Sequence, residues 1–174
     1  MKDILIVYDS KTGNTEKVAK SLAEGAGERC ILAKFNEVPA LNDFSLVVAG
    51  YWVDKGAPND NMKKYLNSLH GKKVVLFQTL GAEPDSAHAV ASLVNAGVCL
   101  PADNKVLATL SIRGAIAPEL IAMMRKMPKD SPHSANSESE ARWAAAANHP
   151  DIADLQKAKE FMQKFILQYD KFLK

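Results

Sequence analysis

The sequence predicts an α/β protein in which a parallel sheet is covered by helices on both faces. Short, nearly continuous apolar runs alternate along the chain with segments whose apolar residues recur every three or four positions. Strands without polar alternation are typical of parallel sheets buried on both faces. The 174 residues are enough for one domain with a sizeable core, so we expect residues 1–174 to form a single domain.

Five segments are predicted as strands, because each is rich in Val, Ile, Leu or Phe and too short for a helix. They are residues 4–8, 29–35, 46–50, 73–79 and 106–112.

Four helices are predicted, because apolar residues recur every three or four positions and would form one buried face on each helix. These faces are Val18, Ala19, Leu22, Ala23 and Ala26; Met62, Tyr65, Leu66 and Leu69; Ala87, Val90, Ala91 and Val94; and Leu155, Ala158, Met162, Phe165, Ile166, Tyr169 and Leu173. We expect Gly25 and Gly27 to end the first helix, since glycine readily adopts the left-handed conformation of a helix end.

The segment 114–150, between the fifth strand and the last helix, reads as a helical insertion. Residues 118–127 predict a short helix with proline in its first turn, rich in methionine. A polar stretch follows, and then residues 137–140 resemble a capping box ahead of a helix over 141–147 that carries Trp143.

The turn after the first strand is the most informative stretch of the chain. Ser10, Thr12 and Thr15 offer three hydroxyls, and Gly13 lets the backbone come close to a ligand. Amides at the start of the following helix favour an anion. No Gly-Lys-Ser/Thr follows, as a nucleoside-triphosphate loop requires, and the Gly-x-Gly-x-x-Gly dinucleotide fingerprint is absent. The turn therefore predicts a site for a phosphate monoester, the alternative being a plain helix start with capping hydroxyls.

These residues also carry a family resemblance. The run Ser10-Lys11-Thr12-Gly13-Asn14-Thr15 is similar to the FMN-phosphate loop of flavodoxins, Ser/Thr-x-Thr-Gly-x-Thr, at every motif position. The resemblance covers about residues 1–113 and the last helix. It implies a flavodoxin-like doubly wound five-stranded parallel sheet of order 2-1-3-4-5, with non-covalent FMN outside the carboxyl ends of the strands.

By position, the loop after the third strand corresponds to the first flavin loop of that family. The residues implied in cofactor binding are Tyr51, Trp52, Val53, Asp54, Lys55 and Gly56. Trp52 would stack on the flavin ring or shield its methyl edge, unless it or Tyr51 packs beneath the next helix. One carbonyl between Asp54 and Gly56 would accept a hydrogen bond from the protonated flavin N5, and the sequence leaves open which one.

The loop after the fourth strand corresponds to the second flavin loop, whose amides bind the pyrimidine end of the ring. The implied residues are Thr79, Leu80, Gly81, Ala82 and Asp85. No tyrosine is present here to stack on the flavin, so one face would be open or covered by residues 114–150. Glu83 and Asp85 would lower the flavin potential, unless they only favour a helix start. Arg113 would reach a substrate carboxylate or the flavin edge, or else cap local carbonyls.

Composition narrows the functional classes. The net charge is only +2, whereas flavodoxins are typically acidic, and no basic run suggests nucleic-acid binding. We expect no membrane span and no signal peptide. Cys30 and Cys99 lie in apolar contexts and are expected to be buried free thiols, so we expect a reduced cytoplasm. The scattered histidines predict no metal site; they are His70, His88, His133 and His149.

Three functional hypotheses remain. The first is an FMN-dependent electron carrier without catalytic side chains, working with a redox partner protein, either a reductase or a flavoenzyme. Residues 51–58 and 79–85 and the insertion also resemble flavodoxin-like proteins that accompany bilirubin reductase in gut bacteria, which implies a flavin reductase acting on a tetrapyrrole as partner. The second is a flavodoxin-like quinone reductase or protoporphyrinogen dehydrogenase with a substrate pocket formed by Trp143 and residues 123–127. The third is a non-redox module that binds a partner through the insertion.

Overall fold

The computed structural model describes residues 2–131 and 134–172, so His133 and Leu173 lie outside it. The strands are β1 Ile4–Tyr8, β2 Cys30–Lys34, β3 Leu46–Asp54, β4 Ala57–Pro58, β5 Lys73–Leu80 and β6 Lys105–Arg113. The helices are α1 Asn14–Ala26, α2 Asp60–Asn67, α3 Ala87–Val98, α4 Pro118–Arg125, α5 Ser137–Ala146 and α6 Ile152–Phe172.

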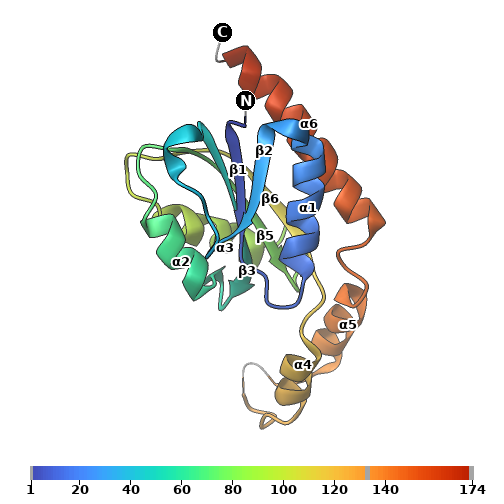
Figure 1. The fold of residues 1–174 in the computed structure, drawn as a ribbon. Helices are drawn as coiled ribbons and strands as arrows, with labels where there is room; N and C mark the ends of the chain where they lie inside the picture. The colour runs from blue at the N-terminus through green and yellow to red at the C-terminus, as the bar shows by residue number, and fades with distance from the viewer. Residues whose placement is uncertain (1, 132–133, 173–174) are drawn as a thin grey trace.

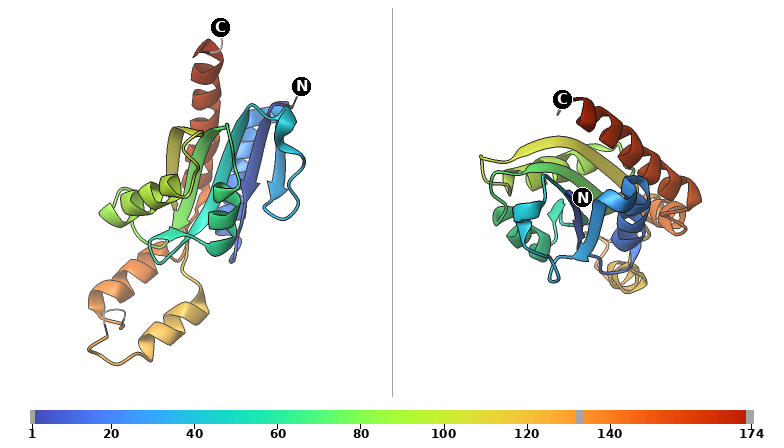
Figure 2. Two further views of the ribbon diagram at one scale, coloured as in Figure 1. Left: turned by 90° about the vertical axis from the view of Figure 1, so that its left-hand side faces the viewer. Right: turned by 45° about the horizontal axis from the view of Figure 1, so that its top comes forward.

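The sheet confirms the predicted doubly wound topology. Five parallel strands lie in the order β2-β1-β3-β5-β6, which is the expected order 2-1-3-4-5 once the short β4 is set aside. Helices α1 and α6 cover one face and helices α2 and α3 the other (Figure 1). Figure 2 shows the same layers from two further directions. No helix in the described parts of the chain is long and apolar enough to cross a membrane.

The core divides into two layers that meet at β1. Ile4 and Ile6 lie in the core layer with α1 and α6, whereas Leu5 and Val7 lie in the layer with α2 and α3, and all four are fully buried. Each such side chain contributes about 1.5–3 kcal/mol through the area it removes from water. Successive side chains of β1 thus point to opposite faces of the sheet, and both faces are covered by helices. This explains why β1 is a continuous apolar run in the sequence.

Helix α3 does not bury the face that the sequence predicted. Val90 and Val94 are 55% and 59% exposed, and the helix packs instead through Ala89, Ser92 and Ala96. The helix carries no charged residue, so it is apolar on most of its circumference and apolar spacing alone does not select the packed side. The small residues permit a close approach to the sheet, and they decide the orientation.

Two further expectations are corrected. Gly25 does not end α1 but lies inside it, where a Cβ would collide with the backbone of Lys159, so its role is to let α6 approach. Gly27, with φ of 63°, does follow the last residue of the helix. The third strand does not stop at Gly50, because Tyr51 and Trp52 continue the parallel pairing with β5.

Residues 114–150 form a helical arm that projects from the carboxyl edge of the sheet, with α4 and α5 side by side (Figures 1 and 2). Arg125 and Glu140 join the two helices through two hydrogen bonds of 2.7 and 2.6 Å. The capping box of α5 is one residue earlier than predicted: the Asn136 side chain accepts from the Ser139 amide, and the Ser139 hydroxyl accepts from the Asn136 amide. Asparagine is as good an N-cap as serine, which explains the shift.

Candidate functional site

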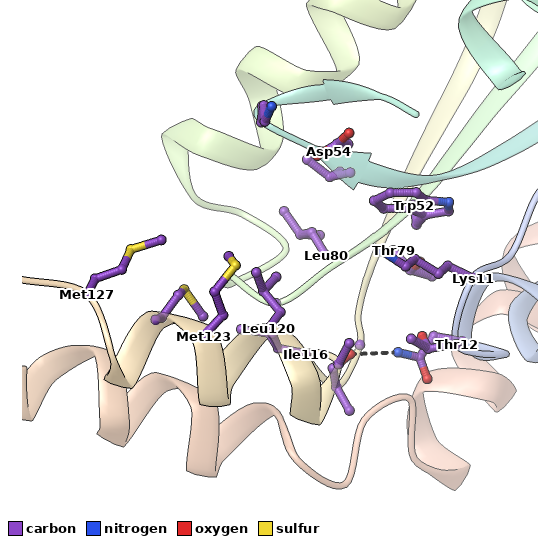
Figure 3. Close-up of a pocket in the computed structure, with 18 residues that line it drawn as sticks. Lys11, Thr12, Trp52, Asp54, Thr79, Leu80, Ile116, Leu120, Met123 and Met127 are labelled. Carbon is purple, nitrogen blue, oxygen red and sulfur yellow. Dashed lines mark hydrogen bonds between the residues drawn. The ribbon is translucent and has the colours of Figure 1, made fainter. Parts of the chain in front are cut away.

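A cavity of about 600 Å³ opens at the carboxyl edge of the sheet, between the turn after β1, the ends of β3 and β5, and the arm (Figure 3). It is lined by Lys11, Thr12, Asn14, Trp52, Val53, Asp54, Lys55, Thr79, Leu80, Gly81, Gly114, Ala115, Ile116, Ala117, Leu120, Met123, Met124 and Met127. Its volume lies within the range of about 300–1,000 Å³ that is usual for small-molecule sites. The three predicted loops thus meet at one cavity.

The turn at residues 10–13 is shaped to receive an anion. Gly13 has φ of 88°, and its amide donates to the Ser10 hydroxyl at 3.1 Å. Helix α1 begins at Asn14, and within the described chain no side chain caps its first turn. Its amides are therefore available to a ligand, and Lys11 and Thr12 are exposed beside them.

Asn14 and Thr15, which belong to the predicted phosphate motif, connect the turn to its surroundings. The Asn14 amide group donates to the carbonyl oxygen of Ala115 at 2.9 Å, and the hydroxyls of Thr15 and Thr79 lie 2.8 Å apart. Both residues are buried. Thr15 is expected to offer a hydroxyl to phosphate, and in the structure that hydroxyl is hydrogen-bonded to Thr79, where the first turn of α1 packs against the end of β5.

Asp9 fixes the other side of the turn. Its Oδ2 accepts hydrogen bonds from the side chains of Asn59 at 2.6 Å and Asn61 at 2.9 Å, at the start of α2. The turn is therefore held from α2, from β5 and from the arm.

The segment after Trp52 is a tight hairpin. Asp54 pairs with Ala57, and the two turn residues, Lys55 and Gly56, have φ of 50° and 75°. Two positive φ values in succession are typical of a two-residue type I′ hairpin. The carbonyl of Gly56 accepts from the Asn95 side chain at 2.7 Å, so α3 holds the tip of the hairpin.

Trp52 and Tyr51 are adjacent in β3, but their side chains lie in different places. Trp52 is half-buried at the cavity, with the Lys11 ammonium 5.3 Å from the centre of its ring, an attractive arrangement of cation and aromatic face. The Tyr51 side chain lies in the core, and does not line the cavity as a cofactor contact would. Its hydroxyl donates to Gln78 Oε1 at 3.0 Å and to the Ser92 carbonyl at 3.2 Å, and burial raises the pKa of Tyr51.

Sequence reasoning missed the buried polar network beneath the site. Gln78 is fully buried, and its Nε2 donates to the Ala89 carbonyl and the Ser111 hydroxyl, both at 2.8 Å. A single glutamine within the apolar strand was the available signal, since a buried amide needs partners on neighbouring elements.

The loop after β5 supplies only part of what was expected. Leu80 and Gly81 line the cavity, whereas Ala82 and Asp85 do not. A Cβ on Gly81 would overlap the side chain of Ile116, so glycine is what lets the arm pack here. Val53, Asp54, Lys55 and Thr79 line the cavity, whereas Ser10, Gly13, Thr15 and Gly56 are not among its lining residues.

Arg113 serves as a local brace. It is buried, and its guanidinium lies 2.5 Å from Glu83 and donates to the Arg142 carbonyl at 3.3 Å. Arg113 is thus committed to capping and to an ion pair, and its charge offsets the negative charge that Glu83 was expected to bring near the cofactor.

The arm forms one complete wall of the cavity. The predicted methionines Met123, Met124 and Met127 are part of it, and Ile116 and Leu120, which sequence reasoning missed, complete it. Trp143, on α5, is 7% exposed and is not among the residues that line the cavity. The prediction that Trp143 and the methionines together form a substrate pocket is therefore wrong for Trp143, since only the methionines line the cavity.

Two other groups of reactive side chains lie elsewhere. His149, Asp151 and Asp154 come together at the start of α6, but the two carboxylates accept backbone amides there, as helix caps do. Cys30 and Cys99 are free thiols, half-buried rather than fully buried, and burial raises the pKa of each.

Comparison with known proteins agrees with this geometry. The family profile described as the flavodoxin domain matches residues 5–163. The flavodoxin-like domain-containing protein BilS of Clostridioides difficile (strain CD3) is 29% identical over 169 residues, which cover 94% of this chain and 96% of the relative. The protein of the same name from Clostridium symbiosum (strain WAL-14163) is 28% identical over 179 residues, covering 90% and 92%.

Solved structures share the fold. Oxidised flavodoxin 2 from Bacillus cereus superposes with a TM-score of 0.57 at 18% identity, covering 95% of this chain and 99% of that one. A flavoprotein from Lactobacillus acidophilus NCFM, solved in complex with FMN, gives a TM-score of 0.52 at 16% identity, covering 64% and 93%.

Proposed function

This chain belongs to the flavodoxin family, and we propose that it is an FMN-binding redox protein that exchanges electrons with a partner oxidoreductase. FMN supplies the one- and two-electron chemistry, and the protein holds the cofactor and tunes it. The observation that carries the proposal is the uncapped start of α1, with its hydroxyl turn, opening into the same cavity as the Trp52 hairpin.

At the phosphate end, the amides of the first turn of α1 and the Thr12 hydroxyl would hold the phosphate monoester. Lys11 adds a positive charge at the mouth of the cavity. Asn14 and Thr15 would act indirectly, because their side chains fix the turn to Ala115 and Thr79.

At the ring end, Trp52, Leu80 and Gly81 would contact the cofactor, and Thr79 would border it. Asn95 already engages the carbonyl of Gly56. The hairpin turn uses the carbonyl of Asp54 in its pairing with Ala57, so the carbonyl of Lys55 is the better candidate to accept a hydrogen bond from flavin N5. Asp85 and the Tyr51 side chain have no such role in this proposal.

A carrier needs no acid, base or nucleophile, and neither histidine nor cysteine is found among the lining residues of the described cavity. The resemblance of residues 51–58 and 79–85 to flavodoxin-like proteins accompanying bilirubin reductase suggests the partner. We propose a flavin reductase acting on a tetrapyrrole, with no nucleic acid involved.

The test uses FMN-loaded protein reduced without oxygen and then mixed with an oxidised electron-accepting protein. A carrier is reoxidised by the acceptor protein and shows no sustained turnover of a quinone supplied with a chemical reductant. Steady quinone or porphyrinogen turnover without a partner would overturn the carrier role. It would favour a flavodoxin-like oxidoreductase, the second candidate, which the apolar wall of the arm supports.

A further inference from the structure

The arm presents a distinct apolar surface to the cavity, which we call the methionine wall: Leu120, Met123, Met124 and Met127. Leu120 is 43% exposed and Met123 is 49% exposed, although large apolar side chains are usually withdrawn from water. Their side chains point into the cavity, opposite Leu80 (Figure 3). The wall is thus a surface that a ligand would cover.

The methionine wall lies at the far end of the cavity from the phosphate turn. In Figure 3, Thr12 and Lys11 stand at one end, Trp52, Thr79 and Leu80 in the middle, and Met127 at the other. The residues suited to phosphate and to the flavin ring occupy the first two positions. If FMN occupies these two positions, as the proposed function has it, the end of the cavity that is bounded by the methionine wall is left for a second ligand.

The chemistry of the two ends differs. All lining residues contributed by the arm are apolar, whereas the charged lining residues are Lys11, Asp54 and Lys55, on the opposite side. A charged or strongly polar group placed against the methionine wall would lose its hydration without gaining a partner, which is costly. Methionine side chains, in contrast, adapt to flat apolar groups and make favourable contacts with aromatic rings.

The wall is fixed relative to the cofactor loops. At the base of the arm, Ala115 receives the Asn14 hydrogen bond and donates its own amide to the His149 carbonyl at 2.7 Å. The amide of Gly114 donates to the Leu80 carbonyl at 2.8 Å. A ligand on the wall would therefore lie at a constant place beside the flavin site.

We propose that the methionine wall is a binding site for an uncharged, planar conjugated molecule, held between α4 and Leu80 next to the cofactor. The proposal rests on the proposed function, because FMN is taken to fill the other end of the cavity. It specifies the class of small molecule that binds beside the cofactor: flat, apolar on the face that meets α4, and without charge there.

The experiment uses the FMN-loaded, fully oxidised protein, so that a quinone probe binds without electron exchange. The probe is 2-(hydroxymethyl)anthraquinone, and anthraquinone-2-sulfonate is its charged counterpart. Binding is followed by the ¹³C-methyl signals of methionine, of which the chain has six. We expect shifts at Met123, Met124 and Met127 and none at Met62 and Met162, which are fully buried in the core.

A matched pair of variants tests the site. Leu120→Gln should weaken binding of the neutral probe about tenfold, because a polar amide would then be covered without a partner. Leu107→Gln should leave binding unchanged: Leu107 is 42% exposed on β6 and does not line the cavity.

The outcomes separate the two proposals. If no bound flavin spectrum forms before the probe is added, the proposed function fails. If the flavin binds but the neutral probe leaves Met123, Met124 and Met127 unshifted, the binding site is overturned while the FMN proposal stands. Equal binding of the sulfonate, or an equal loss in Leu107→Gln, would also overturn it.

Discussion

The side chain of Asn14 donates a hydrogen bond to the carbonyl oxygen of Ala115 at 2.9 Å, across 101 positions of sequence. This contact joins the phosphate turn to the base of the arm. Gly114 makes it possible, since a Cβ at that position would crowd the Asn14 amide. The turn and the arm are thereby parts of one site, although they are far apart in the chain.

Asn14→Ala should therefore weaken both the fold and FMN binding. The Ala115 carbonyl would lose its partner, at a cost of about 1–3 kcal/mol in the free energy of unfolding, measured by urea denaturation. The control is Asn67→Ala, at an exposed position at the end of α2. Equal effects of the two substitutions on stability and FMN affinity would show that the Asn14–Ala115 contact is unimportant.

Thr12→Val and Thr15→Val should separate direct from indirect roles in the phosphate turn. Thr12 is exposed at the cavity, so its loss should weaken FMN binding by about 1.5–3 kcal/mol with the stability of the cofactor-free protein unchanged. Thr15 is buried against Thr79, so its loss should also lower the free energy of unfolding. Titration with FMN and thermal unfolding without it provide the two readouts, and an unchanged affinity of Thr12→Val would refute the assignment of the turn.

The two tryptophans should respond differently to the cofactor. Trp52 lines the cavity and Trp143 is buried in the arm, and the chain has no others. FMN should quench most of the Trp52 emission, so Trp52→Phe should abolish the larger part of the FMN-dependent fluorescence change. Trp143→Phe should retain it. Loss of the change in Trp143→Phe instead would place the flavin against the arm helices.

Arg113→Gln should destabilise the protein by about 1–3 kcal/mol, because two charge-assisted hydrogen bonds are lost from a buried position. It should also lower the flavin potential, since an unbalanced Glu83 carboxylate disfavours added electrons. Arg142→Gln is the control: that side chain is exposed, and only its backbone carbonyl meets Arg113. An equal change of the flavin reduction potential in both variants would contradict the proposal that the Arg113 side chain offsets the charge of Glu83.

The pH dependence of stability should reveal the ion pairs by which Arg29 links Asp3, near the start of the chain, to Asp170, near its end. Arg29 binds Asp3 at 2.7 Å and Asp170 at 2.7 Å, and it holds the pKa of Asp3 below the ordinary value of 3.8. A depressed carboxyl pKa stabilises the fold above the unfolded value, and this contribution is lost as the pH falls through the folded value. Asp3→Asn should cost about 1 kcal/mol at neutral pH.

The difference between wild type and Asp3→Asn should begin to shrink as the pH falls below 3.8, and it should disappear only below the lowered pKa of Asp3 in the folded protein. Asp43→Asn, at an exposed position, should show no such pH-dependent difference. A gap between Asp3→Asn and wild type that stayed constant from neutral to acid pH would exclude the ion pair as its cause.

Much of the fold could be predicted because its signals are local. Continuous apolar runs such as Ile4–Tyr8 indicate strands buried on both faces. The residue types of the hydroxyl-rich turn after β1 likewise predict its local conformation. The face of α3 could not be predicted, because an uncharged helix gives no contrast between its sides. Small residues such as Ala89 and Ser92 packed instead of the valines.

Only those residues of the site that lie at the carboxyl ends of predicted strands could be predicted from the sequence. Trp52 and Leu80 follow from the ends of β3 and β5, but Ile116 and Leu120 enter the cavity through the path of the arm, which no local pattern encodes. Asn14, too, reads as a motif residue in sequence, whereas its side chain is used to hold Ala115. Such contacts depend on tertiary packing between distant segments.

In the proposed function, the turn at residues 10–13 and the start of α1 bind the phosphate of FMN. The most direct measurement compares the dissociation constants of FMN and riboflavin for the cofactor-free protein, since the two ligands share the ring and differ in the phosphate. FMN should bind at least about 100-fold more tightly than riboflavin, because its phosphate accepts two or more hydrogen bonds as a charged group. Equal affinities would contradict this role of the turn.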